Sequence, residues 1–281
     1  MSYNISETNP ERQGLLGYNY NQLAAKYYQQ ISLPEKSHIL DLGCGQGEAT
    51  RLLYQTFSPA QCIGFDLDEA LIEIAINKGG GPIYQQGNAK KLPFENDSFD
   101  LVFARLLLIH VPGCEDVIQE MVRVCKPGGI VMVQDLVIPK TADLYPENWA
   151  YEKINQAMRE LFANPDMGKQ LPLLFKNHGL ADIRIRSDIF LLHEKGLAKK
   201  LMTQTAEGML ERMLGIVQFR QAVRDLFDVK IQTVYLPSLD SFLDSPGEVC
   251  VTSSRPGSCT GHIDQTQQAD FKHTLGGIGH T

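Results

Sequence analysis

The sequence predicts an α/β fold in which a doubly wound, mostly parallel sheet carries helices on both faces. Short apolar segments of strand length alternate with amphipathic segments of helix length over residues 37–135. The connections between them are short and several contain glycine, as expected when crossover helices join parallel strands. One apolar segment, residues 39–42, is followed by a glycine-rich turn, and a helix begins after it at Glu48. Sheets of this kind bind ligands at such a turn between strand and helix.

The elements of this core follow one another in strand–helix order. Strands are expected at residues 39–42, 62–65, 83–86, 99–104 and 130–134, and helices at residues 48–57, 68–78 and 116–124. Asp68 is suited to cap the second helix, because its carboxylate can accept hydrogen bonds from the first free backbone N–H groups. The run from Gly79 to Pro82 then ends that helix.

The rhythm changes from Ile138 onward. Helices are expected at residues 147–162, 167–177, 199–214 and 218–227, and strands at residues 181–186, 189–192 and 229–236, the last of them antiparallel. Pro172 should lie in the first turn of its helix or kink it. We predict one domain over residues 1–252, divided into an N-terminal helical segment (1–36), a core (37–135), and cap helices with late strands (136–228).

The two ends of the chain carry separate predictions. The tyrosine-rich segment 18–28 has helical spacing, and it either packs on the core or forms a lid over a ligand at the edge of the sheet. Residues 253–281 are rich in Ser, Thr, Gly, Gln and His and have few apolar side chains to bury, so a disordered tail is expected. The histidines of this tail match no metal-ligand spacing, and no metal site is predicted.

The composition is that of an ordinary soluble globular protein. Of 281 residues, 43% are hydrophobic and 21% charged, and the net charge is −7. The acidic balance argues against a nucleic-acid partner, and no apolar run is long enough to predict a membrane span. Because the N-terminus has no apolar signal segment and the six cysteines form no C-x-x-C pair, a cytoplasmic protein with reduced cysteines, monomeric or homodimeric, is expected.

The glycine-rich turn, residues 41–47, departs from the pattern that binds a pyrophosphate. Its glycines are spaced G-x-G-x-G rather than G-x-G-x-x-G, and Asp41 precedes the first of them. A carboxylate there would repel a pyrophosphate but suits a cationic group, which disfavours a nicotinamide dehydrogenase. Asp66, at the end of the next strand, is placed to accept hydrogen bonds from both hydroxyls of a ribose. A ribose joined to an amino-acid-like cationic end, without phosphate, describes S-adenosylmethionine.

Five segments in this order resemble the core of the class I S-adenosylmethionine-dependent methyltransferases. They are residues 41–47, residues 64–68, residues 87–89 with 92–94, residues 99–102, and residues 105–111 with 126–129. The resemblance implies a Rossmann-like methyltransferase fold with helical cap segments over residues 37–135 and beyond. It implies S-adenosyl-L-methionine as the cofactor, bound by Asp41, Gly43, Cys44, Gly45, Asp66, Leu67, Asn88, Ala89, Ala104 and Arg105.

The resemblance also implies a role for several of these residues. The glycines would let the backbone contact the methionine moiety, Asp41 would balance its ammonium group, and Leu67 would pack on the adenine. Asn88 stands where this family most often has aspartate. Its side-chain oxygen can accept from the adenine amino group, but it lacks the charge that strengthens such a bond.

The expected reaction is methyl transfer to oxygen, nitrogen or carbon of a small, partly apolar metabolite of the secondary-metabolite or quinone type. Residues 104–107 read Ala-Arg-Leu-Leu, in place of the Asn/Asp-Pro-Pro-aromatic run of methyltransferases that act on amino groups of nucleic acids. His110 is either a general base or a core histidine bonded to a carbonyl group. A non-catalytic S-adenosylmethionine-binding or assembly protein is the alternative.

Overall fold

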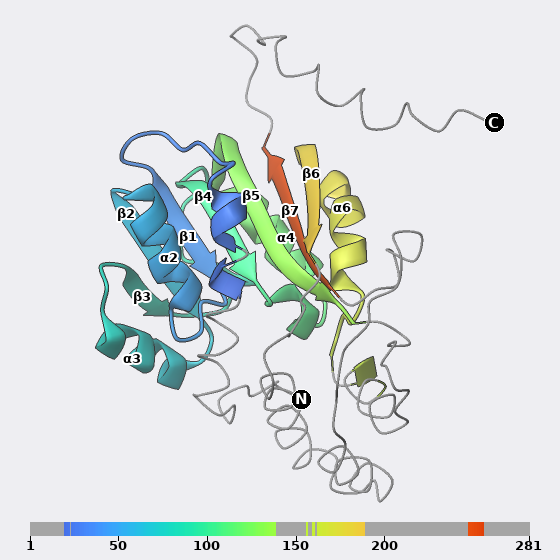
Figure 1. Ribbon diagram of the computed structural model, residues 1–281, viewed down its shortest axis with the longest axis horizontal. Coiled ribbons are helices and arrows are strands. Elements are labelled where there is room, and N and C mark those ends of the chain that lie inside the picture. The colour runs from blue at the N-terminus through green and yellow to red at the C-terminus, as the bar shows by residue number, and fades with distance from the viewer. Residues whose placement is uncertain are drawn as a thin grey trace, which may run out of the picture.

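The computed structural model describes residues 20–22, 24–138, 156, 159–160, 162–188 and 247–255, with the backbone alone at residues 187–188 and 247–251. These residues form one sheet of seven strands in the order β3-β2-β1-β4-β5-β7-β6 (Figure 1). The strands are β1 (His38–Leu42), β2 (Gln61–Asp66), β3 (Ile83–Gln86), β4 (Phe99–Arg105), β5 (Cys125–Val137), β6 (Ala181–Asp188) and β7 (Gly247–Ser254). The pairs among β1 to β5 are parallel, and β7 is antiparallel to both β5 and β6. The predicted doubly wound, mostly parallel sheet is confirmed.

Helices cover both faces of this sheet (Figure 1). They are α2 (Glu48–Phe57), α3 (Glu69–Lys78), α4 (Glu115–Val124) and α6 (Met167–Asn177), with a short 3-10 helix η1 (Leu108–His110) after β4. Every strand and helix expected between residues 37 and 135 is present, with ends within one residue of those predicted except for β5, which begins five residues earlier and ends three residues later than expected. Asp68 caps α3 as predicted, accepting hydrogen bonds from the backbone N–H groups of Ala70 and Leu71.

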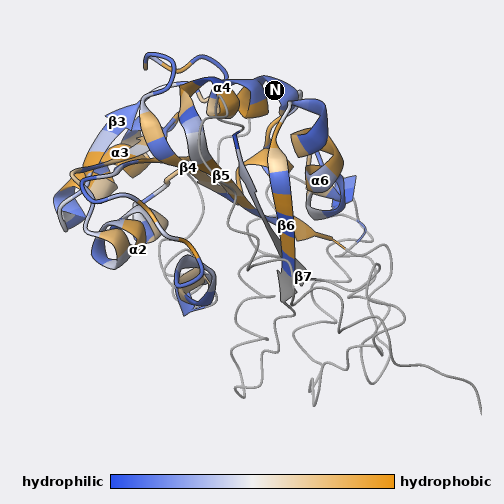
Figure 2. Cartoon of the chain, turned by 90° about the horizontal axis from the view of Figure 1, so that it is seen from above, coloured by the Kyte–Doolittle hydropathy of each residue, from blue (hydrophilic) through white to orange (hydrophobic). Residues whose placement is uncertain are grey.

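Alternation along the strands divides the core in two. On one face, Ile39, Phe103 and Met132 pack with α2 and with Ala24 and Tyr28 of the helical residues 24–28. On the other face, residues such as Leu40, Val102 and Val131 pack against α4 and α6. Figure 2 shows this pattern as hydrophobic strands between helices that are hydrophobic mainly on one side. The two apolar faces hold the sheet rigid, so the residues at its carboxyl edge are well placed to form a site.

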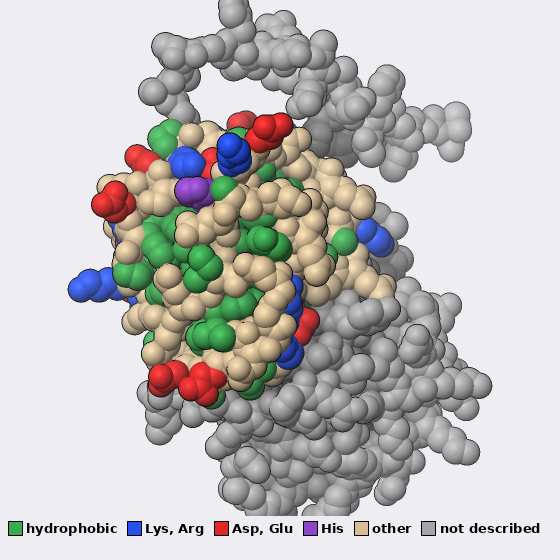
Figure 3. Space-filling model, turned by 90° about the vertical axis from the view of Figure 1, so that its left-hand side faces the viewer, with side chains coloured by type: hydrophobic (Ala, Val, Ile, Leu, Met, Phe, Trp, Pro, Cys, Tyr) green, Lys and Arg blue, Asp and Glu red, His purple; other side chains and the backbone are tan. Residues whose placement is uncertain are grey.

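The edge of the sheet at β3 is more exposed to solvent than the central strands. Figure 3 shows this side of the molecule, where hydrophobic side chains lie open between acidic and basic ones. The large exposed hydrophobic residues of this region are Leu67, Ile76 and Ile83, from the end of β2, from α3 and from β3. Of these, only Leu67 was expected to contact a ligand.

The antiparallel strand of the described sheet is β7, in a segment where no strand was predicted. The last, antiparallel strand was predicted at residues 229–236, which lie outside the described residues, and β7 lies between β5 and β6. The sequence of β7, GEVCVTSS, is half polar and therefore gives a weak strand signal, but pairing on both edges satisfies its backbone. Because β7 reaches Ser254 and Arg255 exchanges backbone hydrogen bonds with Gly128 and Gly129, the ordered domain extends past residue 252.

Other predictions beyond residue 138 have mixed outcomes. Helix α6 is confirmed, but Pro172 lies in its interior rather than in its first turn, so the carbonyl of Gly168 has no intrahelical donor at that position. The strand β6 is also confirmed, and it runs two residues further than expected. Within residues 147–162, the described Gln156, Arg159 and Glu160 are helical. The expected strand 189–192 and helices 199–214 and 218–227 lie outside the described residues.

Candidate functional site

The glycine-rich turn lies between β1 and α2, against the end of β2. The backbone N–H groups of Gly43 and Cys44 both donate to the carbonyl oxygen of Phe65, at 2.8 and 3.3 Å. Gly45 and Gly47 have positive φ angles of 52° and 80°, a conformation that favours glycine. A Cβ atom on Gly47 would lie 2.4 Å from the Tyr84 hydroxyl, whereas one on Gly45 would meet nothing within 4 Å. The backbone at Gly45 is therefore open to a ligand.

Asp66 is joined to this turn by hydrogen bonds. Its Oδ2 accepts from the backbone N–H of Gly45 at 2.7 Å, and its Oδ1 accepts from that of Asp68 at 3.0 Å. Burial raises the pKa of Asp66, while these backbone hydrogen bonds act to lower it. Each carboxylate oxygen can accept a further hydrogen bond, so the hydroxyls of a ribose can still bind here.

Asp41 is almost completely buried at the end of β1, with an exposed fraction of 1%. Its Oδ2 accepts a 2.6 Å hydrogen bond from the Thr50 hydroxyl of α2, whereas its Oδ1 has no partner in the part of the chain that the structure describes. Burial raises the pKa of this carboxyl to about 7, although the Thr50 hydrogen bond and the positive charge of Arg105 oppose the shift. A ligand cation at Oδ1 would supply the missing partner and stabilise the carboxylate.

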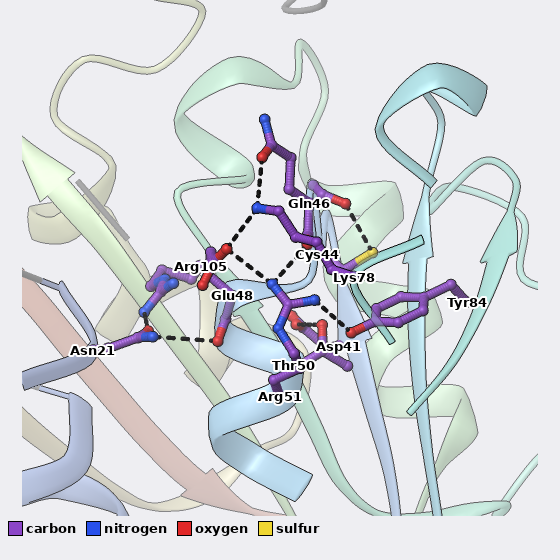
Figure 4. Close-up of polar contacts among 11 residues, drawn as sticks. Asn21, Asp41, Cys44, Gln46, Glu48, Thr50, Arg51, Lys78, Tyr84 and Arg105 are labelled. Atoms are coloured by element: carbon purple, nitrogen blue, oxygen red, sulfur yellow. Dashed lines mark hydrogen bonds and ion pairs between the residues drawn. The ribbon is translucent and has the colours of Figure 1, made fainter. Parts of the chain in front are cut away.

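Arg105 brings a positive charge to the same edge from the end of β4. Its Nη1 donates to Oδ1 of Asn21 at 2.8 Å (Figure 4). Its guanidinium lies 5.9 Å from the centre of the Tyr20 ring. Asn21 also donates to the carbonyl of Glu48 at the start of α2. The N-terminal segment thus packs on the core through Ala24 and Tyr28, as one of its two interpretations predicted. It also reaches the ligand edge, although its role as a lid stays a prediction.

A polar cluster that the sequence did not reveal holds the turn from outside (Figure 4). Arg51 donates to the carbonyl of Gln46 at 2.9 Å and to the Glu48 carboxylate at 2.8 Å. Lys78, from the end of α3, donates to the Gln46 side chain at 2.9 Å and to Glu48 at 2.8 Å. Burial acts to raise the pKa of Glu48, but Lys78 and Arg51 outweigh it and the pKa is lowered. Only the Glu48–Arg51 pair, three residues apart on one helix, had a readable signal.

The residues expected at the adenine lie next to Asp66. The backbone N–H of Gly87 donates to the carbonyl of Asp66 at 2.7 Å, which brings Asn88 and the half-buried Ala89 beside the end of β2. Leu67 is 63% exposed there, so its side chain is available to a flat ligand. Asn88 is exposed, and its Oδ1 already accepts from the backbone N–H of Lys90 at 2.9 Å, a local turn that sequence reasoning missed.

The side chains of two further predicted site residues, Ala104 and Cys44, are buried. Ala104 is completely buried with its side chain in the core cluster of α4 and α6, so only its backbone is available at the strand end. The Cys44 side chain is also buried, and burial raises the pKa of its thiol well above the ordinary value. For both residues, a contact with a ligand would involve the backbone.

His110 ends the short helix η1. Its ring lies 4.9 Å from that of Phe162, centre to centre, with the two planes tilted by 53°. The segment that carries it is fixed by the Asn164 side chain, which donates to the carbonyls of Leu108 and Val111 at 2.7 and 2.8 Å. His110 is half-buried, so neither of its two predicted roles is excluded by its position. Among the described residues, no group of His, Cys, Asp or Glu is arranged to hold a metal ion, and no helix is long and apolar enough to cross a membrane.

Comparisons with known proteins agree with this geometry. Residues 40–133 match the family model described as a methyltransferase domain. The chain is 31% identical over 175 residues to sterol 24-C-methyltransferase ERG6B of Gibberella zeae, covering 60% of this chain and 43% of that protein. It is 33% identical over 149 residues to trans-aconitate 2-methyltransferase of Acidovorax sp., covering 53% of each. It is 30% identical over 143 residues to demethylmenaquinone methyltransferase of Lactiplantibacillus plantarum, covering 48% of this chain and 60% of that protein. The chain therefore spans about half the length of these curated relatives.

Solved structures share the fold at lower sequence identity. The (4+2)-cyclase SpnF has a TM-score of 0.54 and 20% identity, covering 85% of this chain and 82% of that chain. Phosphoethanolamine N-methyltransferase 2 of Haemonchus contortus, solved with phosphomonomethylethanolamine and S-adenosylhomocysteine, has a TM-score of 0.57 and 17% identity, covering 90% of this chain and 60% of that chain. These likenesses confirm the predicted Rossmann-like fold.

Proposed function

We propose that this chain, whose core belongs to the class I S-adenosylmethionine-dependent methyltransferases, transfers a methyl group from S-adenosylmethionine to oxygen, nitrogen or carbon of a small, partly apolar metabolite. One observation carries the proposal: the buried Asp41 has an oxygen without a partner among the described residues, beside the open backbone of Gly45. A positively charged ligand end, seated on a glycine turn next to the ribose-binding Asp66, fits that arrangement.

The residues present fit the whole cofactor. Asp41 and Arg105 form a pair of opposite charges that matches the ammonium and carboxylate of an amino acid. The backbone of Gly43, Cys44 and Gly45 would lie along the methionine chain, and Ala104 would contribute backbone at the end of β4. Toward β3, the Asp66 carboxylate would bind the ribose, Leu67 would pack on the adenine, and Asn88 with Ala89 would bind its edge.

The protein's contribution to the reaction is binding, alignment and exclusion of water. The bound cofactor supplies an electrophilic methyl group, so the reaction needs the acceptor atom held in line with it. Arg105 and Asp41 would fix one end of the cofactor and Asp66 the middle, which leaves the methyl group little freedom. The rigid strands that carry these residues, packed on both faces, support that alignment. We assign His110 a structural role beside Phe162, with proton transfer as the competing role.

The relatives support an acceptor of low molecular weight. The three curated relatives are named for a sterol, for trans-aconitate and for demethylmenaquinone, which are all small molecules. Two of these are largely apolar, in agreement with a partly apolar acceptor. One solved structure that shares this fold is a (4+2)-cyclase. Cofactor binding alone therefore does not distinguish a methyltransferase from the non-catalytic alternative, whereas turnover does.

Calorimetry and a turnover assay test this proposal together. S-adenosylhomocysteine should bind the purified protein, whereas NAD should not. Incubation of the protein with a metabolite extract and S-adenosylmethionine labelled in its methyl group should then give a labelled small molecule. Tight binding of NAD with no response to S-adenosylhomocysteine would overturn the cofactor assignment. Binding of S-adenosylhomocysteine without any labelled product would favour the non-catalytic alternative.

A further inference from the structure

Gln134 is a buried polar residue that the cofactor site does not use. It lies near the carboxyl end of β5, and its exposed fraction is 0%. Neither its Oε1 nor its Nε2 has a hydrogen-bond partner in the part of the chain that the structure describes. A primary amide has two N–H donors and a carbonyl acceptor. A buried amide that makes no hydrogen bond destabilises the folded protein. Such a group calls for an explanation, and a bound ligand is one.

The register of the sheet places Gln134 in a row with the two charged residues of the site. Gln134 pairs directly with Arg105 of β4, and Asp41 of β1 pairs with Phe103, two residues before Arg105. Because side chains alternate along a strand, Asp41, Arg105 and Gln134 all point to the face that packs against α2 and residues 24–28. They are the polar continuation of the apolar residues Ile39, Phe103 and Met132.

The position of Gln134 in this row sets it apart from the cofactor. Under the proposed function, the cofactor extends from β2 and β3 to Asp41 and Arg105 at the ends of β1 and β4. The strand β5 lies about 4.8 Å further on. Gln134 is thus one strand beyond the amino-acid end of the cofactor, on the side of the edge that the cofactor would not occupy. The hydrogen bond from the Leu106 N–H to the Gln134 carbonyl, at 2.8 Å, fixes its backbone there.

We propose that Gln134 binds the methyl acceptor by donating hydrogen bonds from Nε2 to an oxyanion on it, either a phenolate or enolate or a carboxylate. This inference rests on the proposed function. Arg105, which pairs with Gln134 across β4 and β5, brings a positive charge to this part of the edge and favours a negatively charged oxygen over a neutral one. In the transfer, the electron pair of the anionic acceptor forms the new bond to the methyl carbon, and the pair of the broken sulfur–carbon bond stays on sulfur. The positive and negative charges cancel, and no proton moves in this step.

Gln134→Leu and Gln134→Glu test the inference with two probes, trans-aconitate for the carboxylate and reduced demethylmenaquinone for the phenolate. Labelled S-adenosylmethionine reports the transfer, and calorimetry with S-adenosylhomocysteine reports the cofactor site. The wild-type protein should methylate one of the two probes. Gln134→Leu should lower kcat/KM for it at least about tenfold, and Gln134→Glu should lower it further, because its carboxylate repels the oxyanion. Neither substitution should change the affinity for S-adenosylhomocysteine more than about threefold.

The matched control is Gln119→Leu, which removes an exposed amide from α4 on the opposite face of the sheet. It should leave kcat/KM unchanged. Methylation of neither probe, a Gln134→Leu variant with wild-type kcat/KM, or a Gln134→Glu variant more active than Gln134→Leu would each overturn the inference. These failures are distinct from that of the proposed function, which fails only if S-adenosylhomocysteine does not bind or no metabolite of any kind is methylated.

Discussion

Asp41 and Asp135 are two buried carboxyl groups at the same edge of the sheet, on opposite faces, and they differ in how many of their oxygens accept hydrogen bonds. Burial raises the pKa of each to about 7. Both oxygens of Asp135 accept backbone hydrogen bonds, Oδ2 from Ile109 at 3.0 Å and Oδ1 from Leu136 at 2.9 Å. Asp41 has a partner for one oxygen only, among the described residues. A buried acid whose oxygens are all bonded holds a loop in place, whereas one that is half-bonded is ready for a ligand.

The largest effect should come from Asp41→Asn on cofactor binding. Loss of a charged hydrogen bond to the cofactor's ammonium group should weaken the affinity for S-adenosylhomocysteine by about 10- to 100-fold. Asp135→Asn is the control, because its carboxyl is already occupied by backbone groups, and it should change the affinity less than about threefold. Titration calorimetry at pH 7 measures both. Equal losses in the two variants would mean that the comparison does not separate ligand binding from structure.

The same pair should differ in how stability depends on pH. Because the pKa of Asp41 is raised from 3.8 to about 7, the folded protein binds a proton more tightly than the unfolded one. Stability therefore falls as pH rises from about 4 to about 7, and the penalty is complete above pH 7. Asp41→Asn removes this penalty, so it should stabilise the protein without cofactor by on the order of 2 kcal/mol at pH 8 and very little at pH 4.

Asp135→Asn should behave differently in the same experiment. Its raised pKa gives the same pH trend, but the amide group replaces an oxygen that accepts a backbone N–H, so part of the gain is lost at every pH. Urea unfolding of both variants at pH 4 and pH 8 measures the difference. A larger gain at pH 8 for Asp135→Asn than for Asp41→Asn would contradict our account of which carboxyl is satisfied.

A smaller effect should follow from loosening the turn beside Asp41. Lys78→Ala removes two hydrogen bonds, to Gln46 and to Glu48, from a half-exposed side chain. We expect the affinity for S-adenosylhomocysteine to fall by about 2- to 5-fold, since exposed ion pairs contribute little and the effect on the ligand is indirect. Lys126→Ala, which removes a lysine of comparable exposure that pairs with Asp100 at the other end of the sheet, is the matched control and should not change the affinity.

The sequence predicted the cofactor side of the molecule better than the acceptor side, for a physical reason. The positions of the turn 41–47 and of Asp66 follow from residues close by in the sequence. Glycines allow the tight turn, and each ligand-binding segment directly follows its own strand. The partners Lys78, Tyr84 and Asn21 lie 30, 36 and 27 residues from Glu48, and only folding brings them to the turn. Likewise, the sequence alone gives no sign that Gln134 pairs with Arg105 or that Asp135 accepts a hydrogen bond from Ile109.

The strand β7 illustrates the limit most clearly. Only two of its residues, Val249 and Val251, are both apolar and β-branched, so its strand signal is short, and its backbone pairs with β5 on one edge and β6 on the other. Residues 253 and 254 belong to this strand, past the domain end predicted at residue 252, because composition reports what a segment can bury and not what it can pair with. Arg255, whose side chain donates to the Cys125 carbonyl and to Asp97, extends the ordered chain beyond that boundary.

The last expected effect concerns His110, in the loop that Asp135 holds. If the acceptor enters as an anion, no proton has to be removed during transfer, and alignment is sufficient. His110→Asn keeps a hydrogen-bonding side chain and should then lower the single-turnover rate less than about tenfold, short of the 10²–10⁴-fold that a lost general base costs. The variant should also keep the wild-type rate profile across pH 5–9. A drop of about 10³, together with loss of a titration near pH 6.5, would make His110 the base. That result would also show that the acceptor arrives protonated, so the Asp135 side of the edge would take part in the chemistry and not only in holding the loop.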